Sequence, residues 1–178
     1  IRIDVRQIKD IDSMTAQIAT ALGQDPQVKE YTTLQTCSYP AALPDGGTVN
    51  LTVETGDHSI FPVSFSAGIL PTGENEIALS SLNAEELKLS VGDTLDLNVN
   101  GKKSGYTVCG IYSDITNGGK TAKIRNRPDT APVIWSVLYA SLEESTDKEQ
   151  WMAKYRGTGV DVTDVEDYVR DTYAQTLV

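Results

Sequence analysis

Side chains that could carry out acid–base or metal chemistry are few in this sequence. The single histidine, His58, stands beside Asp57 in a predicted turn. Catalysis and metal binding need several groups that converge on one point, and no second histidine is present to join it. We therefore interpret His58 as an exposed surface residue without a chemical role.

Pairs of acidic residues are the other candidates for chemistry. They occur at Glu85-Glu86, at Glu143-Glu144, and at Asp164 with Glu166-Asp167. Paired carboxylates serve glycosidases and bind calcium, so a hydrolase is one hypothesis. These pairs fall at predicted helix starts or on solvated faces, where acidic side chains favour the helix dipole. The hydrolase hypothesis therefore ranks last.

The common sequence signatures of enzymes are absent. The chain has no Gly-x-Ser-x-Gly elbow, no His-Glu-x-x-His motif and no phosphate-binding loop. Cys37 and Cys109 match no zinc or redox spacing, which leaves a disulfide or two buried thiols as alternatives. We accordingly predict no catalytic residue, no metal site and no cofactor, and any linked ATP hydrolysis belongs to another chain.

Charge and hydropathy restrict the partners. The 178 residues include 15 Lys and Arg against 25 Asp and Glu, a net charge of −10. This charge repels phosphate groups, so nucleic acid and anionic lipid headgroups are set aside. The apolar stretches, such as residues 131–140, are shorter than the roughly 20 residues that cross a bilayer. The chain opens on Ile1 with no signal-peptide pattern, which predicts a mature or excised piece of a longer protein.

The opening residues predict a strand followed by a helix. Ile1, Ile3 and Val5 alternate with polar residues, which is the period of a half-buried strand. A helix capped by Asp12 or Ser13 follows. The apolar face of this helix consists of Met14, Ile18 and Leu22, and Gly23 stands just past its predicted end.

Two strand regions come next. Residues 28–39 are rich in Thr, Tyr and Val and predict a strand that ends at Pro40. Residues 49–53 alternate in the same way. We expect them to form a hairpin with residues 60–65 around the turn at Thr55-Gly56-Asp57.

The middle of the chain, residues 68–127, has a different character. Short strands alternate with turns rich in Gly, Asn and Asp, and one brief helix is predicted to begin at Ser80 or Ser81. Asn100-Gly101 predicts the turn of a hairpin. This part of the sequence therefore predicts a small β-rich subdomain.

From residue 131 the opening pattern returns. Residues 133–139 predict a strand, and Thr146 with Glu149 predicts the capping box of a helix. A short strand follows at residues 160–162, and Thr163 with Glu166 opens a last helix. Two strand-helix-strand units thus bracket the β-rich part.

This order predicts the α+β class and a split βαβ sandwich, with a sheet covered by two helices on one side. Residues 1–65 and 128–178 form the sandwich, and residues 66–127 form the inserted β-rich subdomain. Ile1 and Val178 belong to the same sandwich, so we expect both ends of the chain to face one surface.

Four short segments occur in order at residues 68–72, 76–80, 91–95 and 106–111. In order and spacing they resemble the MacB-like extracytoplasmic domain of FtsX-type ABC transporter permeases. The resemblance implies a porter-like sandwich with a small Sabre-like β-rich insert. Cys109 departs from the family pattern, in which an aliphatic residue is more usual.

The motif residues of this resemblance are Gly68, Pro71, Gly92, Asp93 and Gly110. Gly92 permits a positive φ at a corner, and Asp93 can accept hydrogen bonds from the turn backbone. Gly110 leaves room for another segment to cross its strand. The roles of these residues are structural.

The resemblance implies a function in transport. The chain is expected to lie on the extracytoplasmic face of a bacterial membrane as part of a permease, and to couple ATPase-driven membrane motion to a substrate or an extracytoplasmic protein. The implied partners are a cytoplasmic ATP-binding subunit, bound through the parent permease, and a second permease copy. The alternative is a free secreted binding or adhesion module.

Overall fold

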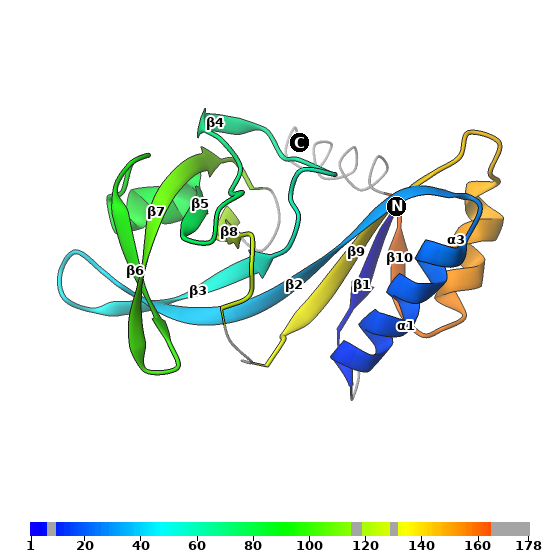
Figure 1. Ribbon diagram of the computed structural model, residues 1–178, viewed down its shortest axis with the longest axis horizontal. Helices are drawn as coiled ribbons and strands as arrows, with labels where there is room; N and C mark the ends of the chain where they lie inside the picture. The colour runs from blue at the N-terminus through cyan, green and yellow to red at the C-terminus, as the bar shows by residue number, and fades with distance from the viewer. Residues whose placement is uncertain (7–9, 115–118, 129–131, 165–178) are drawn as a thin grey trace, which may run out of the picture. The chain divides into compact units, whose positions relative to one another are not determined.

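The computed structural model describes residues 1–6, 10–114, 119–128 and 132–164 (Figure 1). The chain divides into two compact units, one formed by residues 1–34 and 135–178 and the other by residues 35–134. We call the first the sandwich unit and the second the barrel unit. Both contain strands and helices, so the chain belongs to the mixed α+β class that the sequence predicted.

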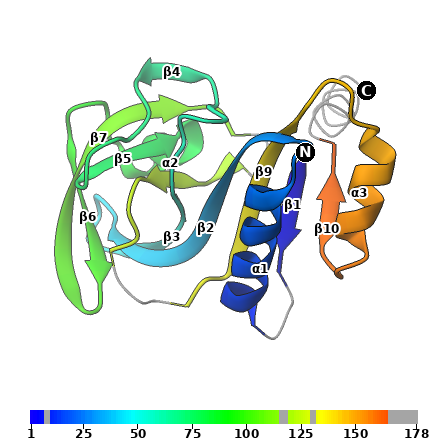
Figure 2. The same cartoon turned by 45° about the vertical axis from the view of Figure 1, so that its right-hand side comes forward.

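The sandwich unit contains two strand-helix-strand segments (Figure 2). Its elements are β1 (Arg2–Val5), α1 (Ile11–Gln24), the first residues of β2 (Val28–Ala42), β9 (Trp135–Leu142), α3 (Lys148–Arg156) and β10 (Asp161–Thr163). Strand β1 pairs antiparallel with β10 on one side and with β9 on the other. The strand order β10-β1-β9-β2 therefore interleaves the two segments.

One hydrophobic core holds the sandwich unit together. Ile3 and Val5 of β1 are fully buried against Ile18 and Leu22 of α1 and against Trp151 of α3. Alternate residues of a strand point to the same face of the sheet. Because both helices share this core, they cover the same face, and the helical face predicted at Ile18 and Leu22 is confirmed.

The helix starts differ slightly from the predicted ones. The N-cap of α1 is Asp10, whose carboxylate accepts a hydrogen bond from the Ser13 N–H at 3.0 Å. The N-cap of α3 is Asp147, which bonds the Gln150 N–H, so Thr146 is not the cap. Aspartate caps a helix as well as serine or threonine does, and sequence patterns do not decide between neighbouring candidates.

The helix predicted from Thr163 lies largely outside the described residues, as does Val178.

The barrel unit is built around a closed ring of strands. Its elements are the remainder of β2, β3 (Thr48–Thr55), β4 (Phe65–Gly68), β5 (Glu76–Ser80), α2 (Ser81–Leu87), β6 (Thr94–Val99), β7 (Lys102–Tyr112) and β8 (Ala122–Ile124). Pairing runs β2-β3-β8-β5-β7. Strand β6 pairs with β7 and, through Ala41 and Leu97, with β2, which closes the ring.

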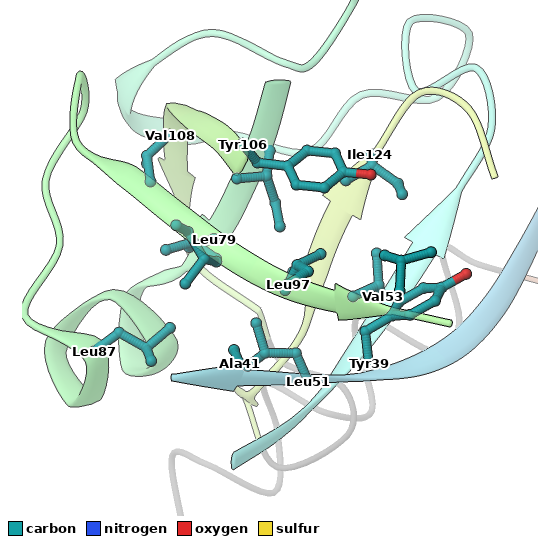
Figure 3. Close-up of a cluster of buried hydrophobic side chains, with 14 of the residues drawn as sticks. Tyr39, Ala41, Leu51, Val53, Leu79, Leu87, Leu97, Tyr106, Val108 and Ile124 are labelled. Carbon is teal, nitrogen blue, oxygen red and sulfur yellow. The ribbon is translucent and has the colours of Figure 1, made fainter. Parts of the chain in front are cut away.

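The interior of this ring is a second hydrophobic core. Tyr39 and Ala41 from β2, Leu97 from β6 and Leu79 from β5 are buried and point toward one another between the strands (Figure 3). Residues 95, 97 and 99 of β6 alternate into this core as the sequence pattern indicated. From α2, Leu87 reaches the same core.

Two strand predictions for this part are wrong. Strand β2 continues past Pro40 to Ala42, and Pro40 lies in register with Asn50 of β3. Residues 49–53 form their hairpin with β2 and not with residues 60–65. The other edge of β3 is occupied by β8, which pairs in parallel, so no place remains for the predicted partner. Proline is tolerated where its missing N–H is not needed by the ladder.

The compact units do not divide where the sequence division was drawn. The boundaries of the units lie at residues 34/35 and 134/135, whereas the predicted ones lie at 65/66 and 127/128. The difference arises from β2 and β3, whose long hairpin contributes Tyr39, Leu51 and Val53 to the barrel core. A hairpin that was assigned to the sandwich thus packs with the β-rich part.

Candidate functional site

The glycines of the sequence motif meet at a crossing of two strands. Gly68 of β4 lies opposite Gly110 of β7. A Cβ on Gly110 would lie 2.3 Å from the Ile69 carbonyl oxygen, and one on Gly68 would lie 2.1 Å from the Cys109 oxygen. Real side chains never approach backbone so closely, so both positions require glycine. Gly68 also has a φ of +65°.

The Gly92-Asp93 pair forms a corner before β6. Gly92 has a φ of +98°, and there is open space around the position of its absent Cβ. The Asp93 carboxylate accepts a hydrogen bond from the Ser90 N–H at 2.8 Å. The Gly92 N–H donates to the Val108 carbonyl, and the Val108 N–H donates to the Asp93 carbonyl, both at 2.8 Å. The corner is thereby fixed to β7.

The loop that carries Pro71 is held by Glu76. Pro71 itself is buried. The Glu76 carboxylate accepts hydrogen bonds from the Gly73 N–H at 2.6 Å and from the Thr72 N–H at 3.2 Å. These bonds hold the pKa of Glu76 below its usual value. The motif residues therefore organise the backbone between β4 and β5 and around β7.

The two cysteines are buried thiols in different clusters. Cys37 belongs to the core inside the ring, and Cys109 belongs to a small cluster with Ala78 and Tyr112 that Phe65 of β4 covers. Burial, with a smaller effect of the Glu76 charge, raises the pKa of Cys109 to about 11. A thiol with so high a pKa is mostly protonated at neutral pH and is a poor nucleophile.

The prediction that His58 is an exposed surface residue is wrong. Its side chain is buried, and Nε2 lies 2.9 Å from the Ile124 carbonyl oxygen. A carbonyl oxygen only accepts, so Nε2 carries the proton of the neutral ring. Nδ1 lies 3.8 Å from the Glu54 carboxylate. Burial, with the nearby Lys123 charge, lowers the pKa of His58 below its usual value and so favours the neutral ring.

His58 belongs to a polar cluster at the junction of β3, β7 and β8. Lys123 pairs with Glu54 at 2.7 Å, and its ammonium lies 5.1 Å from the centroid of the Tyr112 ring. The Tyr112 hydroxyl bonds the Thr121 hydroxyl at 2.8 Å, and Thr121 in turn bonds the Asp114 carboxylate. Burial raises the pKa of Tyr112 well above its usual value. Each of these groups is engaged in holding strands together.

A second polar cluster, in the sandwich unit, is centred on Asp25 at the C-terminal end of α1. Its Oδ2 accepts hydrogen bonds from Trp151 Nε1 at 2.9 Å, Lys154 Nζ at 3.0 Å and the Tyr155 hydroxyl at 3.2 Å. Burial opposes ionisation, but the bonds from Gln27, Lys154 and Trp151 hold the pKa of Asp25 below its usual value. Burial and the Asp25 charge raise the pKa of Tyr155 to about 12. The cluster ties α3 to α1.

The acidic pairs do not form a site among the residues that the structure describes. Glu85, Glu143 and Glu144 are exposed, and Glu86 is paired with Lys120 at 2.9 Å. Asp164 lies 3.5 Å from Lys148, while Glu166 and Asp167 lie outside the described residues. Within the described ranges no group of three or more His, Cys, Asp or Glu is placed to hold a metal ion. In the same ranges, no helix has the length and apolar character to cross a membrane.

The polar clusters could not have been found from the sequence. Glu54 and Lys123 are directly opposite in a parallel pair of strands, 69 residues apart in the chain. Asp25 and Tyr155 are 130 residues apart. Only the helical spacing of Trp151 and Tyr155, four residues apart on one face, hinted that these two side chains act together.

Comparison with solved structures shows where this fold occurs. The chain has the fold of the periplasmic region of MacB from Actinobacillus actinomycetemcomitans, with a TM-score of 0.64 and 10% identity over 97% of this chain and 92% of that one. It is also similar to the extracellular domain of the noncanonical ABC-type transporter YknZ from Gram-positive bacteria, with a TM-score of 0.57 and 16% identity over 84% and 87% of the two chains.

A third similar structure is a domain of a protein assigned as a permease from Porphyromonas gingivalis, with a TM-score of 0.54 and 13% identity over 76% and 71% of the two chains. No protein-family model and no curated protein matches the sequence. The resemblance to extracytoplasmic domains of ABC transporter permeases that the motif segments indicated is thus confirmed as a likeness of fold.

Proposed function

We propose that this chain is the extracytoplasmic domain of an ABC transporter permease and couples ATPase-driven motion of the membrane segments to a substrate or an extracytoplasmic protein. The observation that carries this proposal is the likeness to the periplasmic region of MacB, which extends over 97% of this chain and 92% of that one. Because the similarity covers nearly the whole of both chains, almost every part of this chain has a counterpart in the MacB domain.

The internal construction of the two units supports a mechanical role. Each unit has its own buried core, one around Leu22 and Trp151 and the other around Leu79 and Leu97. Packed cores of this kind move as rigid bodies, which is what hinge and shear motions require. In this proposal the sandwich unit is the porter-like part and the barrel unit is the Sabre-like insert, with their boundaries at residues 34/35 and 134/135 in place of the 65/66 and 127/128 expected from the sequence.

The partners follow from the same proposal. ATP hydrolysis is supplied by a cytoplasmic ATP-binding subunit that reaches this domain through the parent permease, and a second permease copy completes the transporter. The domain lies outside the cytoplasmic membrane, in the periplasm or at the cell surface. In this role its side chains bind and transmit motion, and they catalyse no reaction.

The location can be tested by labelling thiols in intact cells that express the parent gene. Two exposed residues, Lys103 of the barrel unit and Glu144 of the sandwich unit, are replaced singly by cysteine. A membrane-impermeant maleimide should label both variants in cells in which a cytoplasmic marker stays unlabelled. Labelling of either variant only after lysis would contradict an extracytoplasmic domain. The native cysteines are buried and provide an unlabelled background.

The same cells distinguish the alternative, a free secreted module. Under the proposal, the labelled protein sediments with the membrane fraction after a carbonate wash, and a tagged parent purified in mild detergent brings an ATP-binding subunit with it. A labelled protein in the washed supernatant without an ATP-binding subunit would favour the secreted module.

A further inference from the structure

One stretch of the barrel unit lacks ionisable side chains altogether. Residues 59–73 contain no Asp, Glu, Lys, Arg, His, Cys or Tyr, in a chain in which 22% of the residues are charged and the net charge is −10. The stretch includes β4 and the extended residues on both sides of it. We call residues 59–73 the uncharged segment.

Part of the apolar surface of this segment faces solvent. Among the described residues five large apolar side chains are exposed, and two of them, Val63 and Ile69, lie here. Ile69 is the most exposed of the five, at 63%. From Val63 to Ile69 apolar residues at odd positions alternate with Ser64, Ser66 and Gly68 at even positions. In the sequence this alternation is that of a strand with one apolar face. In the structure the bulge between Phe65 and Ala67 puts Phe65 in register with Tyr112 and Ala67 in register with Ile111, so the apolar side chains lie on both faces of the edge.

Strand β4 has a partner on one edge only. It pairs antiparallel with β7 and ends the strand order of the sheet, and no other described strand pairs with it. Figure 1 and Figure 2 both show it at the top of the barrel unit. Its other edge therefore presents backbone N–H and C=O groups that another strand could pair with.

The edge is held in place before any partner arrives. The Ile69 N–H donates to the Cys109 carbonyl at 2.9 Å, and Gly68 packs directly on Gly110. The Phe65 ring contacts Tyr112 edge to face, with the ring centroids 5.8 Å apart. A partner strand would thus meet an ordered edge, and little conformational entropy would be lost by β4 on binding.

Proteins usually protect such an edge, most often with a charged side chain, a proline, a bulge or a very short strand. Strand β4 is short and has a bulge between Phe65 and Ala67, but its exposed positions carry no charge. Of these devices, a charged side chain most directly prevents a second strand from adding, because a lysine would be buried without a partner under the added strand. Its absence leaves the edge open to pairing.

We propose that the outer edge of β4 binds an extended, uncharged strand of an extracytoplasmic protein partner by β-augmentation. Backbone hydrogen bonds supply the attraction, and the apolar residues of the uncharged segment contact alternate side chains of the partner. The charge pattern selects the partner, because a charged strand would lose hydration against this surface without gaining an ion pair. The shortness of β4 makes the contact weak and reversible.

This inference names the surface through which the protein partner of the proposed function would bind, and to that extent it rests on that function. The experiment requires only the 178-residue chain and an artificial strand. Its failure would remove the docking surface and leave the membrane location and the ATPase coupling untouched.

The probe is a capped seven-residue peptide that alternates valine and threonine, titrated into the isotope-labelled chain. Amide chemical shifts should change along residues 63–69 and on β7, with a single dissociation constant. A peptide N-methylated at every internal amide should not bind, because its internal backbone has no N–H groups left to donate hydrogen bonds to the edge of β4. A peptide with glutamate in place of threonine should bind more weakly. Equal binding of the methylated peptide would overturn the proposal.

Substitutions locate the surface. Ala67→Lys and Ile69→Lys should each weaken binding of the valine-threonine peptide by at least about tenfold, since each places a charge beneath the added strand. Val91→Lys is the matched control, because Val91 is an exposed apolar residue of the same unit at 44% exposure, outside the uncharged segment. It should bind as the original chain does. Val63→Lys replaces either test variant that fails to give a native spectrum.

Two other occupants of the edge would overturn the proposal. If the chain forms a dimer in sedimentation equilibrium that Ala67→Lys abolishes, a second copy takes the edge. If neutral phosphatidylcholine vesicles bind the chain and Ile69→Lys prevents it, the exposed apolar residues serve a lipid surface. Unchanged peptide affinity in both Ala67→Lys and Ile69→Lys would also exclude the β4 edge.

Discussion

At the scale of single residues, the barrel depends most on positions where a side chain has no room. Gly110 is the clearest, because the Ile69 carbonyl and the Phe65 ring occupy the place of its missing Cβ. The sequence indicated this residue as one that leaves room for a crossing segment. It could not indicate that the crossing segment is β4, because Gly68 and Gly110 are 42 residues apart and no local pattern connects them.

Gly110→Ala should lower the free energy of unfolding by about 1 to 3 kcal/mol, the usual cost of forcing an extra methyl group into packed structure. Urea unfolding followed by tryptophan fluorescence measures it. Gly105→Ala on the same strand is the control, because its Cβ would meet Asp96 at an ordinary 3.6 Å. It should change stability by less than about 0.5 kcal/mol. Equal effects of the two substitutions would refute the crowding argument.

The sequence pattern predicted an exposed His58, and the structure shows it buried. Its neighbours in the chain are those of a turn, and the burial comes from β8, whose Ile124 carbonyl lies 66 residues away. The groups around the ring are Glu54 of β3 and Lys123 of β8. Their net effect with burial is a pKa below the ordinary value of 6.5.

The stability of the chain should therefore fall as the pH is lowered from 7 through the range just below 6.5. In that range the unfolded chain takes up a proton on His58 that the folded chain does not, and this favours unfolding. The stability that the neutral His58 ring contributes is fully present above pH 6.5 and is lost as the pH falls below that value. Free energies of unfolding in urea at several pH values measure the slope. His58→Gln should flatten it, and a variant with the original slope would show that other groups cause it.

At the scale of elements, local sequence patterns predicted the strands and turns whose formation depends on residues close together in the chain. The alternation of Ile3 and Val5 gave β1, and the Asn100-Gly101 turn is confirmed by φ values of +53° and +78°. The order of the strands in the barrel could not be read in this way. The parallel pair β3-β8 joins Val53 to Ala122, and only the closing of the ring brings these residues together.

The contact between α1 and α3 is another feature of elements that the sequence does not show. Asp25→Asn removes the charge that three donors of α3 share, so it should lower the free energy of unfolding by about 1.5 to 3 kcal/mol, the usual range for charge-assisted hydrogen bonds. Thermal unfolding followed by circular dichroism measures the change.

Glu30→Gln is the matched control for this prediction, because Glu30 is an exposed carboxylate of the same unit. Its effect should stay below about 0.5 kcal/mol. If Asp25→Asn and Glu30→Gln are equally mild, the bonds from Trp151, Lys154 and Tyr155 contribute little to stability.

At the scale of the whole molecule, the family resemblance predicted more than periodicity did. The segments around Gly68, Gly92 and Gly110 indicated the fold that MacB and YknZ share, although identity to their solved domains is only 10% and 16%. Gly68 and Gly110 leave no room for a side chain, whereas many apolar combinations fill a core equally well, so the motif glycines are more specific to this fold than the core residues are. The resemblance did not predict the boundaries of the two compact units, because they depend on where the β2-β3 hairpin packs.

The claim that this domain moves with the ATPase is tested most directly by a distance measurement between two permease copies. A spin label is attached to Lys103→Cys at the exposed start of β7 in the parent transporter, purified with its ATP-binding subunit. Double electron–electron resonance then compares nucleotide-free transporter with ATP-bound transporter that carries a hydrolysis-deficient subunit. We predict that the distance distribution between the labels shifts on ATP binding. The same distribution in both states, in a transporter whose unmutated form hydrolyses ATP, would contradict the coupling.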